Sequence, residues 1–243
     1  MTHDLTGGKS TSDATATRRL VLLASGAAAL GLTSLAALAQ QKKGPPPAAG
    51  EVPAADLMKP GPLPDLALGK ADAPVTIVEF ASLTCGHCAN FHNTVFPKLK
   101  EKYIDTGKVR FILREFPLDN RAAAAAMVAR CAGEDKSYAL ITDMFTKQES
   151  WAFVQPAAFI PALFEVSKAH GFTKESFDKC VADQKLLDNV AAARDLANKS
   201  FGVRSTPTFF INGRRLDGNP GAIESFDKAI EAATAPAAPA EKK

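Results

Sequence analysis

The sequence has little of what nucleic-acid-binding chains share. Aromatic residues make up only 7% of its 243 residues, the formal net charge is +3, and lysine and arginine form no long run. Surfaces that bind DNA or RNA combine clustered basic side chains with aromatic rings for stacking, so this composition gives no support to a nucleic-acid partner. With 46% hydrophobic and 23% charged residues, the chain has the ordinary composition of a globular protein with one good core.

Charge is absent from one long apolar stretch, residues 20–39, which follows an arginine pair at 18–19. This pattern predicts an export signal, and the polar leader and the Ala- and Gly-diluted run favour the twin-arginine (Tat) type. Ala-Leu-Ala at 37–39 has the small-x-small pattern of a signal peptidase site, so we expect cleavage after Ala39 and a periplasmic protein. An uncleaved run would instead be long enough to anchor the chain in a membrane. Because no cysteine lies near this site, a lipoprotein is excluded.

Proline, alanine and glycine dominate the stretches on either side of the main unit. Residues 40–64 predict an extended linker with little to bury, and the tail at 235–243 has a similar composition. Residues 65–234 lie between these two stretches and are predicted to form one compact unit.

Hydrophobic periodicity predicts the order of elements in that unit. β-branched runs predict strands at 74–80 and 108–116, and between them apolar residues at a helical spacing begin after Cys85, with Pro97 expected to kink the helix. A block of about 119–201 is helical throughout. Strands then return around Asn212-Gly213, a strong hairpin signal, and an amphipathic helix follows. The pattern predicts an α/β unit interrupted by a helical insertion.

The chain has only four cysteines, and two of them are separated by a Gly-His pair. Four cysteines in an exported chain could form two structural disulfides, but a bridge from Cys85 to Cys88 closes a tiny loop and stabilises little. A strand leading into a helix places Cys85 at the helix N-terminus. The positive end of the helix dipole, and His87 when protonated, favour a thiolate there. Cys88, one turn further, would be the shielded resolving thiol.

A metal site is the alternative for the same stretch. It would use Cys85, His87, Cys88 and His92 as ligands. Structural zinc sites draw their ligands from two separated pairs, and this chain has no second Cys-x-x-Cys, so the pattern favours redox chemistry without a metal or an organic cofactor.

Two features distant from the cysteines strengthen the redox prediction. Glu79 lies on the apolar strand six residues before Cys85, where a buried carboxylate with a raised pKa could relay the proton of Cys88. The alternative is a solvated Glu79 at a sheet edge. Thr206-Pro207 begins a later strand, and a cis peptide bond is one reason for proline to occur there.

Cys131 and Cys180 lie in two different predicted helices of the insertion. In an oxidising compartment this separation suits a structural disulfide, which would stabilise the fold by about 4 kcal/mol in the chain-entropy model. Two unlinked buried thiols are the alternative.

The segments VEFASLTCGHC at 78–88 and GVRSTPTFFINGRRLDG at 202–218, with the helical insertion between them, resemble the thioredoxin superfamily. Within it the chain resembles the DsbA-like thiol:disulfide oxidoreductases of alphaproteobacteria, over residues 65–234. The resemblance implies a thioredoxin fold, with a central mixed sheet flanked by helices and an inserted all-helical subdomain. It also implies that Cys85 is the exposed nucleophile and Cys88 its buried partner.

The same resemblance assigns roles to three more residues. Glu79 would be the buried acid and Pro207 a cis-proline that faces the active site. Thr206 would offer its backbone to an extended substrate by strand-like pairing.

The resemblance also implies partners: reduced secreted proteins as substrates and a membrane reoxidant of the quinone-linked DsbB type. Since only a linker precedes the unit, where bacterial isomerases of this class carry a dimerisation domain, we expect a monomeric oxidase. Gly86-His87 matches eukaryotic protein disulfide isomerase rather than the Pro-His of the best-known DsbA, so a reductase or isomerase direction stays open. A non-catalytic envelope binding or surface protein with this fold is a further alternative.

Overall fold

The computed structural model describes residues 50–235. The predicted export signal at 1–39, its cleavage site after Ala39, and the tail from residue 236 lie outside the described residues. Within the described range, no helix combines the length and apolarity needed to cross a bilayer.

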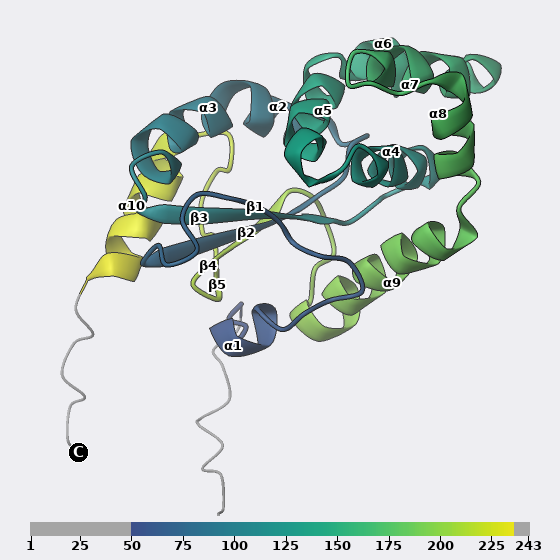
Figure 1. Ribbon diagram of the computed structural model, residues 1–243. Coiled ribbons are helices and arrows are strands. Elements are labelled where there is room, and N and C mark those ends of the chain that lie inside the picture. Colours follow the sequence, from purple (N-terminus) through teal and green to yellow (C-terminus); the bar gives the residue numbers. More distant parts are fainter. Residues whose placement is uncertain (1–49, 236–243) are drawn as a thin grey trace, which may run out of the picture. The chain divides into compact units, whose positions relative to one another are not determined.

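A five-stranded mixed sheet forms the centre of the described chain, in the order β1-β3-β2-β4-β5 (Figure 1). β2 and β3 are parallel, and the other neighbouring strands pair antiparallel. The short edge strand β1 was not predicted from the sequence. Asn212 and Gly213 form the predicted two-residue turn between β4 and β5, both with positive φ, as such a hairpin turn requires. The strands are β1 Leu66–Leu68, β2 Val75–Ala81, β3 Val109–Glu115, β4 Thr208–Ile211 and β5 Arg214–Arg215.

Helices lie on both faces of the sheet, with α10 and α3 on one side and α1 and α9 on the other (Figure 1). The described helices are α1 Ala54–Leu57, α2 Gly86–Asn90, η1 Phe91–Val95, α3 Phe96–Leu99, η2 Lys100–Ile104, α4 Asn120–Cys131, α5 Glu134–Thr146, α6 Gln148–Trp151, η3 Pro156–Ala158, α7 Phe159–Lys168, α8 Lys174–Val181, α9 Gln184–Phe201 and α10 Ile223–Thr234.

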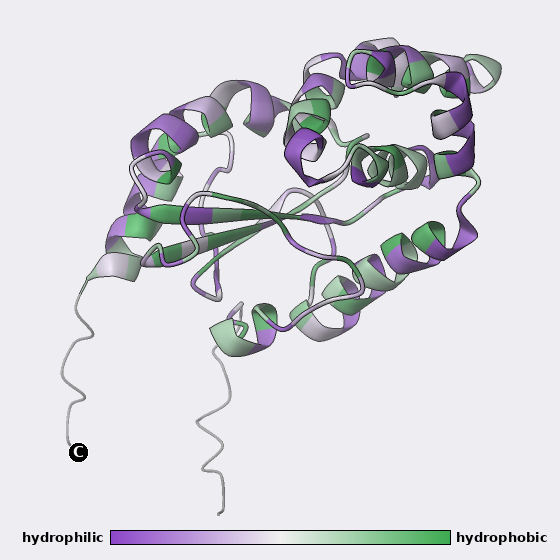
Figure 2. Cartoon of the chain, in the orientation of Figure 1, coloured by the Kyte–Doolittle hydropathy of each residue, from purple (hydrophilic) through white to green (hydrophobic). Residues whose placement is uncertain are grey.

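The residues of β2 alternate between two buried clusters. Ile77 and Ala81 belong to the cluster under α2, α3 and α10, whereas Val78 and Phe80 belong to the cluster under α9. Figure 2 shows hydrophobic residues along much of the strands and a mixture of hydrophobic and hydrophilic residues along the helices that cover them. Because side chains alternate along a strand, Glu79 lies on the same face as Ile77 and Ala81, beneath the helix that carries the redox motif.

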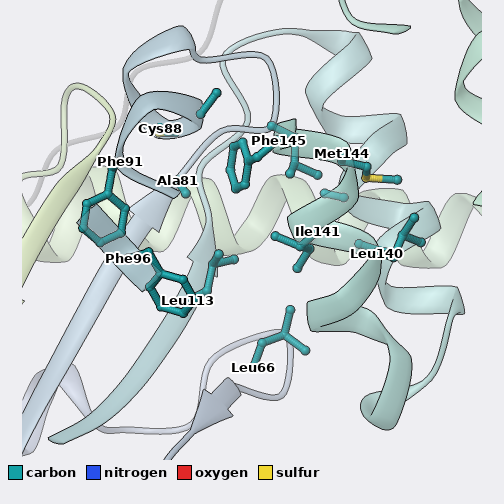
Figure 3. Packing of buried hydrophobic residues seen from close by; sticks show 14 of the residues in the cluster. Leu66, Ala81, Cys88, Phe91, Phe96, Leu113, Leu140, Ile141, Met144 and Phe145 are labelled. Atoms are coloured by element: carbon teal, nitrogen blue, oxygen red, sulfur yellow. The ribbon is translucent and has the colours of Figure 1, made fainter. Parts of the chain in front are cut away.

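The predicted fold class is confirmed: a central mixed sheet, flanking helices and an inserted helical block between β3 and β4. The insertion shares its core with the sheet. Ile141 and Phe145 of α5 lie in one buried cluster with Phe91 and Leu113 (Figure 3). The last helix of the block, α9, packs on the opposite face of the sheet. The insertion and the sheet are therefore parts of one packed unit.

The helix that follows Cys85 contains two π-helical turns, η1 and η2, on either side of α3. Pro97 lies in the first turn of α3, directly after η1. Proline lacks an N–H group and clashes with the preceding turn, and a π-turn is one way in which a helix accommodates such an interruption. The apolar face predicted for this helix, from Phe91 to Tyr103, is buried.

The described part of the predicted linker packs on the domain, so the prediction of an extended linker is wrong for residues 51–58. Leu57 is only 2% exposed and lies in the cluster beneath α9. Arg114 donates from Nη1 to the carbonyl oxygen of Leu57 at 2.6 Å, and Val52 donates from its N–H to the carbonyl of Gly213. Burial of Leu57, which contributes about 1.5–3 kcal/mol for a fully buried leucine, acts together with these hydrogen bonds to hold the segment.

Candidate active site

Strand β2 leads into the cysteine pair through the short loop 82–84. Cys85 has an extended backbone, with φ −83° and ψ 117°, and is the N-cap of α2, which begins at Gly86. Its carbonyl accepts the first helical hydrogen bond, from the N–H of Ala89 at 3.0 Å. Cys85 thus lies at the helix N-terminus, where backbone N–H groups lack partners within the helix. Gly86 and His87 are both exposed.

The thiol of Cys85 lies at the edge of the core, 8% exposed. Both thiols of the pair are free, so the structure represents the reduced site. A hydrogen bond from the Cys88 thiol is the main cause that lowers the pKa of Cys85 to about 5, and burial opposes it. The neighbouring Thr206 and the N–H groups of Cys88 and His87 lower the pKa further. The site therefore favours a thiolate at Cys85.

Cys88 has the opposite environment. It is fully buried, in the cluster that Figure 3 shows together with Phe91 and Phe145. Burial raises the pKa of Cys88 well above that of a free cysteine, and the neighbouring Cys85 and the charge of Glu79 raise it further. Cys88 is consequently a protonated thiol that donates to the thiolate beside it.

A buried Glu–His pair lies behind Cys88. Glu79 is 0% exposed, which rules out the solvated alternative, and its Oε2 lies 2.8 Å from Nε2 of His92. His92 is also buried rather than on the helix surface, and its ring stacks on Phe145 with centroids 4.3 Å apart. Within residues 50–235, Oε1 of Glu79 has no hydrogen-bond partner. One carboxylate oxygen is thus held in place while the other stays available.

The loop before β4 lies next to Cys85. The Thr206-Pro207 peptide bond is cis, and the carbonyl oxygen of Thr206 lies 3.3 Å from Sγ of Cys85. Both residues are partly exposed. The backbone of Thr206 therefore lies beside the sulfur that a substrate would approach.

The loop before Cys85 is held by Gln148 and Asp119, and neither contact was predicted from the sequence. Gln148, at the start of α6, donates from Nε2 to the carbonyl oxygens of Leu83 at 2.7 Å and of Cys85 at 3.2 Å. Thr84 donates from Oγ1 to Oδ2 of Asp119 at 2.8 Å. A buried glutamine and an N-cap aspartate carry no spacing signal that links them to a cysteine motif far away in the sequence.

The metal alternative counted His92 as a possible fourth ligand beside Cys85, His87 and Cys88. His92 instead pairs with Glu79, and residues 50–235 contain no cluster of three His, Cys, Asp or Glu side chains suited to hold a metal ion.

A disulfide joins Cys131, at the end of α4, to Cys180 of α8, with Cα atoms 6.2 Å apart. The two residues are 49 positions apart, and the bond connects two helices of the insertion. The alternative of two unlinked thiols does not hold in this structure.

A family model described as Thioredoxin matches residues 63–232. Among solved structures, alpha-DsbA1 of Wolbachia pipientis matches with a TM-score of 0.66 and 33% identity, over 74% of this chain and 94% of that chain. The chain is a DsbA-like member of the thioredoxin superfamily. A protein-disulfide isomerase structure from Novosphingobium aromaticivorans matches this DsbA-like chain with a TM-score of 0.60 and 26% identity, over 70% of this chain and 98% of that chain.

Curated relatives of this DsbA-like chain are named for disulfide chemistry. A Rickettsia bellii protein named for protein-disulfide oxidoreductase activity is 35% identical over 170 residues, which are 69% of this chain and 65% of that protein. A Bacillus anthracis protein named for disulfide bond formation is 31% identical, over 68% of this chain and 76% of that protein. The chain therefore spans a little less than two thirds of the length of the Rickettsia relative.

Proposed function

We propose that this chain is an exported thiol:disulfide oxidoreductase that introduces disulfides into envelope proteins through Cys85 and Cys88. The observation that carries the proposal is the opposite shift of the two thiols, with the pKa of Cys85 lowered to about 5 and the pKa of Cys88 raised. A site that stabilises a thiolate stabilises the reduced form of the pair. Its disulfide is then a better oxidant.

The proposed reaction begins when a substrate thiolate attacks Sγ of Cys85 in the oxidised enzyme. A bond forms between the substrate sulfur and Cys85, the Cys85–Cys88 bond breaks, and the electron pair leaves on Cys88, which takes up a proton because its pKa is high. A second substrate thiolate then attacks the substrate sulfur of the mixed disulfide, and Cys85 leaves as a thiolate. Two substrate thiols are oxidised to a disulfide, and the enzyme pair is reduced.

Three groups around the pair support this reaction. Glu79, held through one oxygen by His92, would exchange the proton of Cys88, since its other oxygen is buried and unbonded within residues 50–235. The exposed backbone beside Cys85 at Thr206 and Pro207 would pair with an extended substrate segment, as an added strand does. The names of the relatives point to protein thiols as the substrate class.

The remaining parts of the proposal come from the family resemblance and the N-terminal sequence. The signal pattern at 1–39 supports export to the periplasm. A DsbB-type membrane partner would accept the two electrons from the reduced pair and pass them to a quinone, and the enzyme would act as a monomer.

The proposal is tested by equilibrating the protein, residues 40–243, with glutathione buffers and measuring the fraction of Cys85–Cys88 disulfide by mass spectrometry. An oxidase is expected to have a potential in the range of about −180 to −120 mV. A value near that of thioredoxin, about −270 mV, would instead assign the site to the reductase direction. Oxidation of a reduced, unfolded protein by stoichiometric enzyme supplies the functional readout.

The low pKa of Cys85 also predicts how stability depends on pH. Its value of about 5 lies below the value of an unfolded cysteine, about 8.5. The thiolate therefore stabilises the reduced protein fully above about pH 8.5, and this contribution is lost as pH falls through 5. We expect the unfolding midpoint of the reduced protein to fall more from pH 8 to pH 5 than that of the oxidised protein, which has no Cys85 thiolate, and a Cys85→Ala variant to lack this extra fall.

A further inference from the structure

Gln148, a residue of the helical insertion, bonds directly to the backbone of residues 83–85, the segment that leads into α2. Gln148 is only 5% exposed, and its Nε2 donates to the carbonyl oxygens of Leu83 and Cys85, at 2.7 and 3.2 Å. A primary amide has two N–H donors, so both are used on backbone acceptors of the same loop. Gln148 thus spans the two ends of the segment 83–85 from a helix that lies 63 residues beyond Cys85 in the sequence.

The start of α2 lacks a side-chain cap. Cys85 occupies the N-cap position and makes no side-chain capping bond, so the usual support of a helix start is missing. α2 is also only five residues long before the π-turn of η1 begins. The carbonyl of Cys85 is the first acceptor of this helix, and it is one of the two atoms that Gln148 holds.

The position of the Cys85 backbone decides which donors its sulfur meets. The N–H groups of His87 and Cys88 at the start of α2 lower the pKa of the Cys85 thiol, and this effect depends on the N-cap residue staying in its extended conformation beside them. A shift of the loop would move Sγ away from these groups.

We propose that Gln148 is a positioning residue of the redox site: its amide fixes the Cys85 backbone so that Sγ stays beside the first N–H groups of α2. This inference rests on the proposed thiol:disulfide exchange. It gives the helical insertion a further role, because Gln148 then influences the reactivity of Cys85. A purely structural role, in which Gln148 only satisfies two buried carbonyls, makes a different prediction.

The test compares Gln148→Met with the wild-type protein. The methionine side chain is similar to that of glutamine in length and volume, carries no charge and has no hydrogen-bond donor. The substitution therefore removes both hydrogen bonds with little change in shape. Gln184→Met on the exposed start of α9 is the matched control, because Gln184 bonds only to the side chain of Asp188. Gln148→Asn, whose amide is too short to reach both carbonyls, is a second variant in case the methionine variant does not fold.

Three quantities are measured for each variant: the pKa of Cys85 from the pH dependence of its alkylation, the glutathione equilibrium constant, and the urea unfolding midpoint. For Gln148→Met we expect the pKa of Cys85 to rise by about one unit and the equilibrium to shift about tenfold towards the disulfide form. The Gln184→Met control should leave both values unchanged.

An unfolding midpoint that falls while the pKa and the equilibrium stay at wild-type values would overturn the inference and leave the proposed function intact. A wild-type protein whose Cys85 titrates like a free cysteine would overturn the proposed function itself, and the inference with it. The two failures are therefore distinguished by the wild-type titration alone.

Discussion

This molecule contains two cysteine pairs, one with free thiols and one joined by a disulfide. Cys85 and Cys88 are two residues apart, free, and electrostatically unlike each other, whereas Cys131 and Cys180 are 49 positions apart and bonded. The first pair closes a loop too short to restrict the unfolded chain, so its bond stores little stability and is available for exchange. The second closes a long loop between two helices. Loop length and local electrostatics, rather than the presence of cysteine, separate a reactive sulfur from a structural one.

The largest expected effect concerns the reactive pair. Cys85→Ser should abolish disulfide exchange, because the buried Cys88 then has no partner with which to form the disulfide that a substrate thiolate attacks. Cys88→Ala should retain attack through Cys85 but lose the resolving thiol, so mixed disulfides with substrate proteins accumulate. Non-reducing gel electrophoresis followed by mass spectrometry measures both.

Mixed disulfides captured by Cys88→Ala would also identify natural substrates. The absence of any such species, in a host that makes reduced envelope proteins, would favour the non-catalytic binding protein over the enzyme. A variant with Cys131 replaced by Ser and Cys180 by Ala serves as the control, since it leaves the reactive pair unchanged and adds no free thiol.

The next effect concerns the structural pair. Replacing Cys131 by Ser and Cys180 by Ala should lower the free energy of unfolding by about 4 kcal/mol, because the unfolded chain regains the freedom of a loop of about 50 residues. Exchange through Cys85 should continue under conditions in which the variant stays folded. Urea unfolding of both proteins, each with the Cys85–Cys88 bond oxidised, gives the difference.

Two outcomes would contradict the distinction between a reactive and a structural pair. In the first, the variant without Cys131 and Cys180 keeps its full stability. In the second, it stays folded but loses exchange through Cys85. The second outcome would mean that the disulfide in the insertion takes part in the reaction.

A smaller effect is expected from Glu79→Gln, which removes the proton acceptor behind Cys88 but keeps an oxygen for His92. The attack of Cys88 on a mixed disulfide at Cys85 should slow by about 10²-fold near neutral pH, since general base catalysis contributes on that scale. Stopped-flow measurement of glutathione release from the Cys85 mixed disulfide tests it.

Glu115→Gln is the matched control for this variant, because Glu115 is also buried but pairs with Arg130 rather than with the redox site. We expect it to reduce stability and leave the rate unchanged. Equal slowing in both variants would show that Glu79 acts through the fold alone.

The smallest effect is expected from Gly86→Pro. Proline is favoured at the first position of a helix, and Cys85 already has the extended backbone that a residue before proline adopts. A Cβ at Gly86 would meet no atom within 4 Å. The reduced protein should gain about 0.4–1 kcal/mol in thermal or urea unfolding, mainly because the unfolded chain becomes stiffer. A loss of stability would mean that this stretch is held more tightly than its exposure indicates, and Gly86→Ala gives the intermediate case.

Short-range patterns in the sequence determined much of this protein. The strand that carries Glu79, the helix that begins after Cys85, the turn at Asn212-Gly213 and the helical block between β3 and β4 all follow from hydrophobic period and turn residues. These signals are local, because each depends on contacts within a few residues. The prediction of a buried Glu79 rested on the apolar run around it and on the family resemblance.

Tertiary structure alone decided which groups meet around the sulfur atoms. Gln148 reaches Cys85 across 63 positions, and Thr206 reaches it across 121. His92 was named as a possible metal ligand, and its pairing with Glu79 was not predicted. The packing of Leu57 likewise overturned the prediction of an extended linker. No periodic signal encodes such contacts, because they depend on how far each helix turns and where it crosses the sheet. The sequence thus determined that Cys85 is placed to be reactive, and the fold determined which donors set how reactive it is.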